Sequence, residues 1–266
     1  MEKFKLGIIG AGNMAGAVLN GILCNGLLTP SDIVISDIDV EKLIYWKNKG
    51  VNTVSDNELL LKNAEFIILA VKPQVARSIL GGYKSKASGR KFISIMAGID
   101  KRELCTMLGG ASVARVMPNT PCLVGEGMCA VDAEGFSSED KLFILDIFGS
   151  LGKVIELPET LFHAVTAVSG SGPAYVYMFI GAMIKGGVNA GLDEKTARLL
   201  TLQTFYGAAK MSETFGSTDE LIKKVCSPNG TTIEAVNYFK EADLEKTIAI
   251  GMEKCEKRSK ELSGNA

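Results

Sequence analysis

The segment Gly10-Ala11-Gly12-Asn13-Met14-Ala15 has the residue types and spacing of a phosphate-binding turn. It follows an apolar run, Phe4–Ile9, and opens an amphipathic one. In a G-x-G-x-x-A pattern the first glycine permits a tight turn, the second lets the backbone approach a pyrophosphate, and the small last residue allows close helix–strand packing. The N–H groups at the start of the following helix favour negative charge. The segment therefore predicts a dinucleotide site.

A second segment suited to an anionic ligand lies near the other end of the chain. Cys226-Ser227-Pro228-Asn229-Gly230-Thr231-Thr232-Ile233 forms a predicted turn into a helix and is rich in hydroxyls and N–H groups. That combination suits a small carboxylate. Three further segments stand at expected strand ends or helix starts, Ala70-Val71-Lys72-Pro73, Met117-Pro118-Asn119-Thr120-Pro121 and Ser169-Gly170-Ser171-Gly172-Pro173-Ala174-Tyr175.

The overall charge and the scarcity of histidine exclude several kinds of function. The 266 residues include 29 Lys or Arg against 30 Asp or Glu, for a net charge of −1. This balance gives no electrostatic case for binding nucleic acid or an anionic membrane surface. The one histidine, His163, excludes a histidine-clustered metal site, so we expect no metal. Six cysteines without a C-x-x-C pair predict reduced thiols, and Cys226 is interpreted as a buried thiol rather than a nucleophile.

The first part of the chain alternates short apolar runs with amphipathic stretches. Such a rhythm predicts an α/β fold with a doubly wound, mostly parallel sheet and helices on both faces. In the first amphipathic stretch, Met14, Val18 and Ile22 lie on one helical face. The expected strands are Phe4–Ile9, Ile33–Ser36, Glu65–Val71, Lys91–Ile95, Ser112–Met117 and Lys153–Leu157.

After Pro158 the patterns become helical throughout, so we place a domain boundary there. Residues 1–160 form the predicted dinucleotide-binding domain and residues 161–266 an all-α domain. The expected helices are Ala174–Asn189, Glu194–Phe215, Thr218–Val225, Thr231–Phe239 and Asp243–Leu262. The helix at Ala174–Ile184 is apolar nearly all round, which predicts burial in a core or against a second subunit.

No membrane segment or secretory leader is expected. The uncharged stretch Ala164–Ile184 has the length of a membrane span, but Ser169–Pro173 should break it and leave too few apolar residues. The charged residues Glu2, Lys3 and Lys5 at the start do not fit a signal peptide. We therefore expect a cytoplasmic protein.

Asp37, directly after the second expected strand, bears on the choice of nucleotide. An acidic residue there normally accepts from the ribose 2′-OH and repels a 2′-phosphate. Ser36 and Lys42 could still accommodate a phosphate, so both cofactors stay open. The alternative is that Asp37 or Asp39 only caps the next helix.

Together, the Ser-Gly-Ser-Gly-Pro-Ala-Tyr and Ser-Pro-x-Gly-Thr-Thr-Ile segments and the glycine motif resemble pyrroline-5-carboxylate reductase over essentially the whole chain. The resemblance implies reduction of the imino acid 1-pyrroline-5-carboxylate to L-proline by NADPH or NADH, the last step of proline biosynthesis. It implies a Rossmann domain followed by a helical substrate-binding and dimerisation domain. The expected partner is a second copy of the chain in a homodimer, which this family often builds into larger rings such as a decamer.

The resemblance also assigns roles to residues. Gly10 to Met14 would hold the pyrophosphate, Asn57 would lie by the adenosine ribose, and Ala70, Lys72 and Pro73 would approach the nicotinamide half. Gly230, Thr231 and Thr232 would bind the substrate carboxylate and ring nitrogen, with Thr232 as the catalytic residue. Ser227 would lie close by, and Glu159 would lie near the substrate pocket. The remaining expected cofactor residues are Ile9, Ser36, Asp37, Val71, Ala97, Gly98 and Asn119.

The chain departs from the family pattern at two positions. Asn229 replaces a glycine, but asparagine tolerates a left-handed conformation, so the turn is expected to survive. Asp37 stands where relatives often carry a small hydroxyl residue, which raises the chance of effective NADH use.

Two other functions compete with this interpretation. A β-hydroxyacid dehydrogenase shares the two-domain layout and needs a helical catalytic lysine, for which Lys185 is the candidate. A non-enzymatic dinucleotide sensor needs no substrate turn. Within the reductase hypothesis, larger cyclic imines also stay open as substrates.

Overall fold

The computed structural model describes residues 4–264, which divide into two compact units. The second unit is Gly172–Lys254, and the first contains the other described residues, including the end of the last helix from Cys255. These units are defined by packing. The expected functional domains, residues 1–160 and 161–266, stay a prediction.

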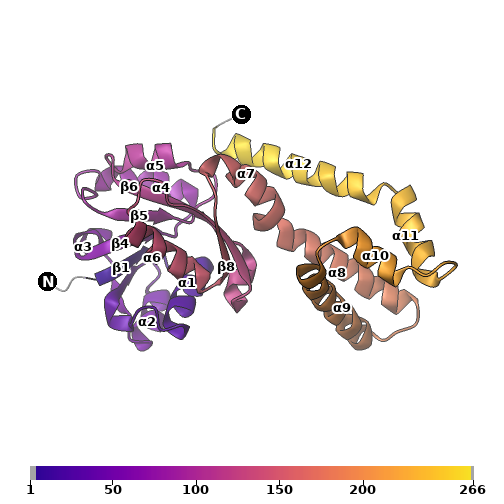
Figure 1. Cartoon of the computed structure of the whole chain (residues 1–266). Helices are drawn as coiled ribbons and strands as arrows, with labels where there is room; N and C mark the ends of the chain where they lie inside the picture. The colour runs from indigo at the N-terminus through magenta and orange to yellow at the C-terminus, as the bar shows by residue number, and fades with distance from the viewer. Residues whose placement is uncertain (1–3, 265–266) are drawn as a thin grey trace. The chain divides into compact units, whose positions relative to one another are not determined.

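The first unit contains an eight-stranded sheet in the order β3-β2-β1-β4-β5-β6-β7-β8. Figure 1 labels β1, β4, β5, β6 and β8 of this sheet. All neighbouring strands are parallel except β6 and β7. The order of β1 to β6 is that of a doubly wound dinucleotide-binding sheet, which confirms the predicted fold class. The strands are β1 (Phe4–Ile9), β2 (Ile33–Ser36), β3 (Asn52–Val54), β4 (Ala64–Leu69), β5 (Lys91–Ser94), β6 (Ser112–Met117), β7 (Gly127–Asp132) and β8 (Gly152–Glu156).

The register of the sheet brings the ends of the central strands to one level. Ile9 of β1 pairs with Ser36 of β2 and with Leu69 of β4. The residues that follow these strands therefore emerge side by side at one edge. This edge lies where the strand order reverses, between β1 and β4, and ligands bind at such positions in open α/β sheets.

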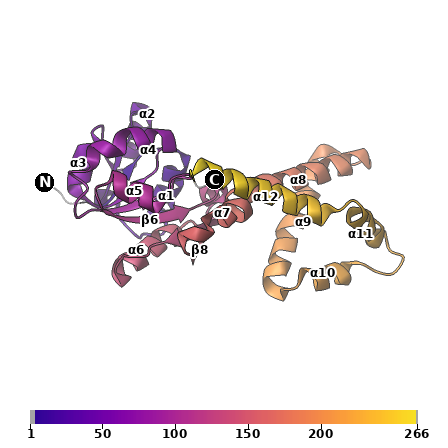
Figure 2. The ribbon, with the colours of Figure 1, turned by 90° about the horizontal axis from the view of Figure 1, so that it is seen from above.

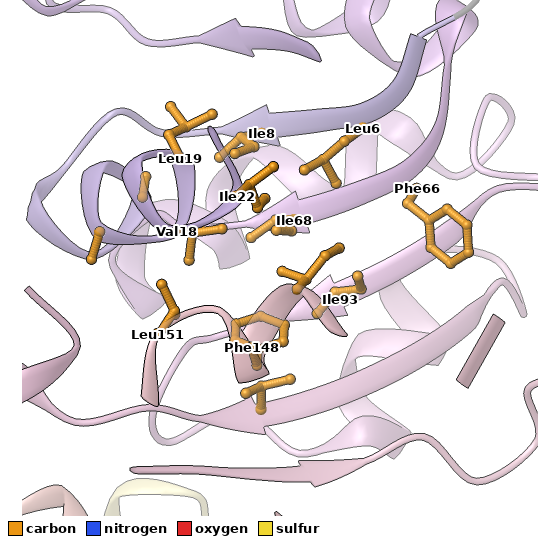
Figure 3. Close-up of a cluster of buried hydrophobic side chains, with 14 of the residues drawn as sticks. Leu6, Ile8, Val18, Leu19, Ile22, Phe66, Ile68, Ile93, Phe148 and Leu151 are labelled. Carbon is orange, nitrogen blue, oxygen red and sulfur yellow. The ribbon is translucent and has the colours of Figure 1, made fainter. Parts of the chain in front are cut away.

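Helices cover both faces of the sheet because side chains alternate along each strand. Leu6 and Ile8 of β1 pack with α1 and α6 on one face (Figure 3), whereas Ile9 packs with α3, α4 and α5 on the other. The helices of this unit are α1 (Asn13–Cys24), α2 (Val40–Asn48), α3 (Asn57–Asn63), α4 (Pro73–Ile79), α5 (Lys101–Met107), α6 (Ser138–Gly149) and α7 (Phe162–Val165).

The second unit is helical, as predicted for the chain after Pro158, and α8 packs against α9 (Figure 2). Its helices are α8 (Gly172–Asn189), α9 (Glu194–Phe215), α10 (Thr218–Val225), α11 (Thr231–Glu241) and α12 (Leu244–Leu262), the last of which ends in the first unit. No residue of α8 is buried, and the side chain of Met178 is 75% exposed. Burial in the core of its own chain, one of the two expected explanations for this apolar helix, is therefore wrong.

The expected break at Ser169–Pro173 is limited to a bend at Ser171, between a π-helical turn and α8. Thr166–Gly170 forms a π-helical turn, and Pro173 lies in the first turn of α8, where its missing N–H leaves no helical hydrogen bond unmade. Counted together across this bend, residues Glu159–Asn189 are long and apolar enough to cross a membrane by length and composition. The same length and composition occur in helices that pack against a protein partner.

Two strands were missed by the sequence analysis. β3 has three residues, none of them buried, and so lacks an apolar pattern. β7 reads Gly-Met-Cys-Ala-Val-Asp, with a single β-branched residue, and is identified by its pairing with β6 and β8.

Candidate nucleotide and substrate sites

A cavity of about 430 Å³ lies at the ends of β1, β2 and β4. It is lined by glycine backbone, short polar side chains, a few aliphatic side chains and two lysines, Lys42 and Lys72. The cavity brings together most of the expected cofactor residues: Ile9, Gly10, Gly12, Ser36, Asp37, Asn57, Ala70, Val71 and Lys72. Ile9 and Lys72, which are 63 positions apart in the sequence, therefore line one site.

Gly10 and Gly12 of the first motif are glycines for different structural reasons. Gly10 has φ +100°, and a Cβ added there would lie 2.6 Å from the Ala70 carbonyl oxygen, so only glycine fits. A Cβ on Gly12 would have no atom within 4 Å. Gly12 is the N-cap of α1 and offers no side-chain cap, which leaves the first N–H groups of the helix for a ligand. The open space in front of them fits a pyrophosphate.

Asp37 faces the glycine turn. Its Oδ2 accepts the N–H of Ala11 at 2.6 Å, and its Oδ1 accepts the N–H of Asp39 at 2.8 Å. The N-cap of α2 is Asp39, which accepts the N–H groups of Glu41 and Lys42. The capping alternative therefore holds for Asp39, and Asp37 lines the cavity.

A chain of hydrogen bonds fixes the polar side chains beside Asp37. Ser36 Oγ donates to Asn57 Oδ1 at 2.6 Å, and Asn57 Nδ2 donates to Tyr83 Oη at 2.7 Å. Burial raises the pKa of Tyr83, so its hydroxyl stays protonated at neutral pH. Asn57 is thereby held at the cavity by two partners.

Besides Asn119, six expected cofactor residues do not line this cavity. Ala11 and Asn13 line a neighbouring cavity of about 500 Å³ next to Trp46, Met14 packs on the core, and Pro73 begins α4. Gly98 follows β5 with φ +74°, beside the exposed Ala97. Their roles toward a cofactor stay predictions.

Asn119 also lies outside the cavity. Its Oδ1 accepts the N–H of Met128 at 2.9 Å, and its Nδ2 donates to the Ser169 carbonyl at 3.3 Å. The side chain thus ties the end of β6 to the start of β7 and to the π-helical turn. Its expected position by the cofactor stays a prediction.

Sequence reasoning missed the apolar part of the cavity, Ile38, Val75 and Ile79, together with Ser55. Ile38 is fully exposed although it is aliphatic. An apolar side chain between two aspartates at a strand end is the signal that could have found it, since a flat adenine ring needs apolar surface to lie on.

Glu159, expected near the substrate, lies in a network of ion pairs in the first unit. Its Oε1 accepts from Arg115 Nη1 at 2.6 Å and from the N–H of Lys101 at 2.8 Å. Asp132 Oδ1 pairs with Lys101 Nζ at 2.7 Å, and Asp132 Oδ2 accepts the N–H of Glu159 at 2.7 Å. Burial opposes the charged form of Asp132, but the hydrogen bonds from Lys101 and two backbone N–H groups outweigh it and lower the pKa of Asp132.

The predicted carboxylate turn lies in the second unit, between α10 and α11. Asn229 has φ +58°, so it adopts the left-handed conformation expected of the missing glycine. Gly230 is the N-cap of α11 without a side-chain cap, and a Cβ there would lie 2.3 Å from Ser227 Oγ. Ser227 and Thr231 are exposed, whereas Thr232 is half-buried and lines a mainly apolar cavity of about 480 Å³.

Comparisons with known proteins agree with these features. Residues 159–262 match the model for pyrroline-5-carboxylate reductase dimerisation, and residues 5–98 match the model for NADP oxidoreductase, coenzyme F420-dependent. The pyrroline-5-carboxylate reductase of Arabidopsis thaliana is 38% identical over 98% of this chain and 96% of its own. The chain belongs to the pyrroline-5-carboxylate reductase family.

Solved structures of the family have the same fold. A Plasmodium falciparum pyrroline carboxylate reductase with NADP bound gives a TM-score of 0.89 at 33% identity, covering 99% of both chains. The Coxiella burnetii pyrroline-5-carboxylate reductase gives 0.91 at 34% identity, covering 98% of this chain and 99% of its own. Family membership favours the reductase over the β-hydroxyacid dehydrogenase with Lys185 and over the non-enzymatic sensor.

We predict that substitution of Gly10 lowers the stability of the protein, whereas substitution of Gly12 weakens dinucleotide binding. Gly10→Ala should destabilise the unliganded protein by about 3 kcal/mol, because it adds backbone strain and a clash with Ala70. Gly12→Ala should change the free energy of unfolding by less than about 1 kcal/mol but weaken dinucleotide binding at least about tenfold by filling the pyrophosphate space. Urea unfolding and fluorescence titration with NADH measure the two effects. Equal losses of stability in both variants would contradict the assignment.

We predict an acid-dependent effect of Asp132→Asn. Because the folded pKa of Asp132 is lowered, its contribution is fully present above the unfolded pKa, about 3.9, and is lost as pH falls through the folded pKa. The variant should lose about 3 kcal/mol at pH 7, since Lys101 is left without its buried partner, and the difference from wild type should narrow below about pH 4. Denaturant unfolding across pH tests this. The exposed Asp146→Asn serves as the control, and a difference that persists undiminished in acid would refute the prediction.

Proposed function

We propose that this chain reduces 1-pyrroline-5-carboxylate to L-proline with NAD(P)H, the last step of proline biosynthesis. The observation that carries the proposal is similarity to pyrroline-5-carboxylate reductases along the whole chain, as in the Methanosarcina acetivorans relative at 38% identity over 98% of this chain. The cavity at the strand ends and the uncapped turn at Gly230 supply the two kinds of site that this reaction needs.

The first unit would hold the cofactor, which supplies a hydride when bound. The N-terminal N–H groups of α1 would bind its pyrophosphate, with the turn at Gly10 keeping the backbone out of the way. Asp37 and Asn57 would hold the adenosine ribose, with Ile38 against the adenine. Ala70, Lys72 and Pro73 would contact the nicotinamide half.

The turn into α11 would bind the substrate. The N–H groups at Gly230 to Thr232 would hold the carboxylate, favoured by the positive end of the helix dipole. We assign Thr232 to the ring nitrogen, through its hydroxyl. A protonated imine carries its own electrophilic charge, so C5 can accept a hydride without a strong protein acid. Glu159 has its carboxylate committed to Arg115 and to the Lys101 N–H, and we propose that it positions these groups.

We also propose a homodimer formed through the apolar surface of the second unit. Val176, Tyr177, Met178 and Met183 on α8 are all at least 43% exposed. A single chain leaves this surface in water, and a second copy would bury it. Larger rings of dimers, up to a decamer, would extend the same assembly. With a net charge of −1 and a pathway of small metabolites, we propose a cytoplasmic enzyme that needs neither nucleic acid nor a membrane.

We predict that Thr232→Ala lowers kcat/KM for 1-pyrroline-5-carboxylate by about 10- to 100-fold, because it removes a hydrogen bond to a charged group. The Kd of the cofactor should stay unchanged, and Thr232→Ser should restore most activity. Steady-state NAD(P)H oxidation checks this, with Thr247→Ala, an exposed threonine of α12, as the control. A loss confined to cofactor binding would refute the role of Thr232.

The same assay with other substrates tests the proposed function. Activity with a 3-hydroxy acid in place of the imine would refute the proposed function. Activity with a six-membered cyclic imine would show whether the site accepts a larger ring.

We predict that Met178→Glu yields monomers at protein concentrations where the wild type is dimeric. The change places a charge at the centre of the proposed interface, where burial without a partner is unfavourable. Light scattering after gel filtration measures the mass. Leu142→Glu on α6, similarly exposed but in the first unit, should leave the mass unchanged. A monomeric wild type would exclude the dimer.

A further inference from the structure

The rim of the nucleotide cavity beside β2 carries more negative than positive charge. Asp37 is held by two backbone N–H groups, those of Ala11 and Asp39, so its carboxylate has a fixed place on the rim. Asp39 follows on the same loop and also lines the cavity. Lys42 is the cation of this rim, and its Nζ already pairs with Asp39 Oδ2 at 3.3 Å. The three side chains together leave one net negative charge.

Two neutral donors next to Asp37, the Ser36 hydroxyl and the Asn57 amide, are already used inside the protein. The Ser55 hydroxyl also lines the cavity but brings no positive charge to it. The buried hydroxyl of Ser36 donates to Asn57 Oδ1, and Asn57 donates in turn to Tyr83. A phosphate has only acceptor oxygens, so it needs donors that are free to turn toward it. Ser36 could provide its hydroxyl only by giving up the hydrogen bond that holds Asn57.

The other lysine of the cavity is attached to a different strand. Lys72 follows β4, and β1 lies between β4 and β2 in the sheet. Two strand spacings amount to about 10 Å. The charge of Lys72 is therefore attached well away from the loop that carries Asp37.

We propose that Asp37 makes this chain select NADH over NADPH, an inference that rests on the proposed use of a nicotinamide dinucleotide. Only part of the acceptor capacity of Asp37 is taken by the N–H groups, so a ribose 2′-hydroxyl can donate to the remainder. A 2′-phosphate would bring close to two negative charges against Asp37 and Asp39 and would compete with Asp39 for Lys42. The Plasmodium falciparum relative was solved with NADP bound.

The test is calorimetric titration of the full-length protein with NADH and with NADPH, without the imine. The wild type should bind NADH at least about tenfold more tightly. In Asp37→Asn the amide oxygen can still accept the Ala11 N–H while the charge is lost, so this preference should fall to about twofold or less. Asp37→Ser, which removes the charge and supplies a hydroxyl that can donate to a phosphate, should shift the preference toward NADPH. Glu139→Gln, an equal change of net charge at an exposed site on α6, should retain the wild-type ratio.

Two results would overturn the inference. One is wild-type binding of NADPH as tight as that of NADH, or no measurable binding of either. The other is a ratio that does not change in Asp37→Asn, shown by thermal unfolding to be folded. Because the titration contains no imine, it tests cofactor selection independently of the proposed reaction. If only the proposed function is wrong, NADH binds selectively but no pyrroline-5-carboxylate is reduced.

Discussion

The close passage of the backbone at Gly10 over the Ala70 carbonyl is the constraint on which the nucleotide cavity depends. Gly10 donates its N–H to the Ser36 carbonyl at 2.8 Å and turns with positive φ, so the chain leaves β1 without covering the ends of β2 and β4. A side chain at this position would push the turn away from β4. The N-terminus of α1 would then no longer face the cavity. The direction of α1 and the shape of the cavity at the strand ends thus both depend on Gly10.

The ion-pair network at Glu159 fixes a different part of the same unit. Arg115 and Asp132 lie opposite each other on β6 and β7, the antiparallel pair, and both are buried. Charges taken out of water stabilise a fold only when each is paired and hydrogen-bonded. Here the carboxylates are held by Lys101, Arg115 and backbone N–H groups. Phe162 packs against the Arg115 guanidinium at 5.2 Å, so the network also fixes the start of the helix that follows β8.

Much of the fold could be predicted because its signals are local. The bounds of β1, β2 and β6 agree with their apolar runs, and those of α9 and α10 agree with their helical patterns. The short β3 and the polar-ended β7 depend on pairing with neighbours, which a linear pattern does not contain. Whether α8 is buried in the core or exposed on the surface of the chain could not be predicted either. An apolar helix can have the same sequence whether a core or a partner covers it. In the nucleotide cavity the glycines and Asp37 were found from the motif. The bond from Ala11 to Asp37 and the exposure of Ile38 arise only once the loops are folded.

Because the apolar surface of α8 is exposed in a single chain, the stability of the folded state is expected to depend on protein concentration. Under the proposed dimerisation, the burial that offsets the chain entropy of the second unit is completed by another molecule, so mass action enters its folding equilibrium. Dilution would then act as a denaturant. A newly made chain would pass through a stage in which Tyr177 and Met178 face water, and it would leave that stage faster where many copies are made together.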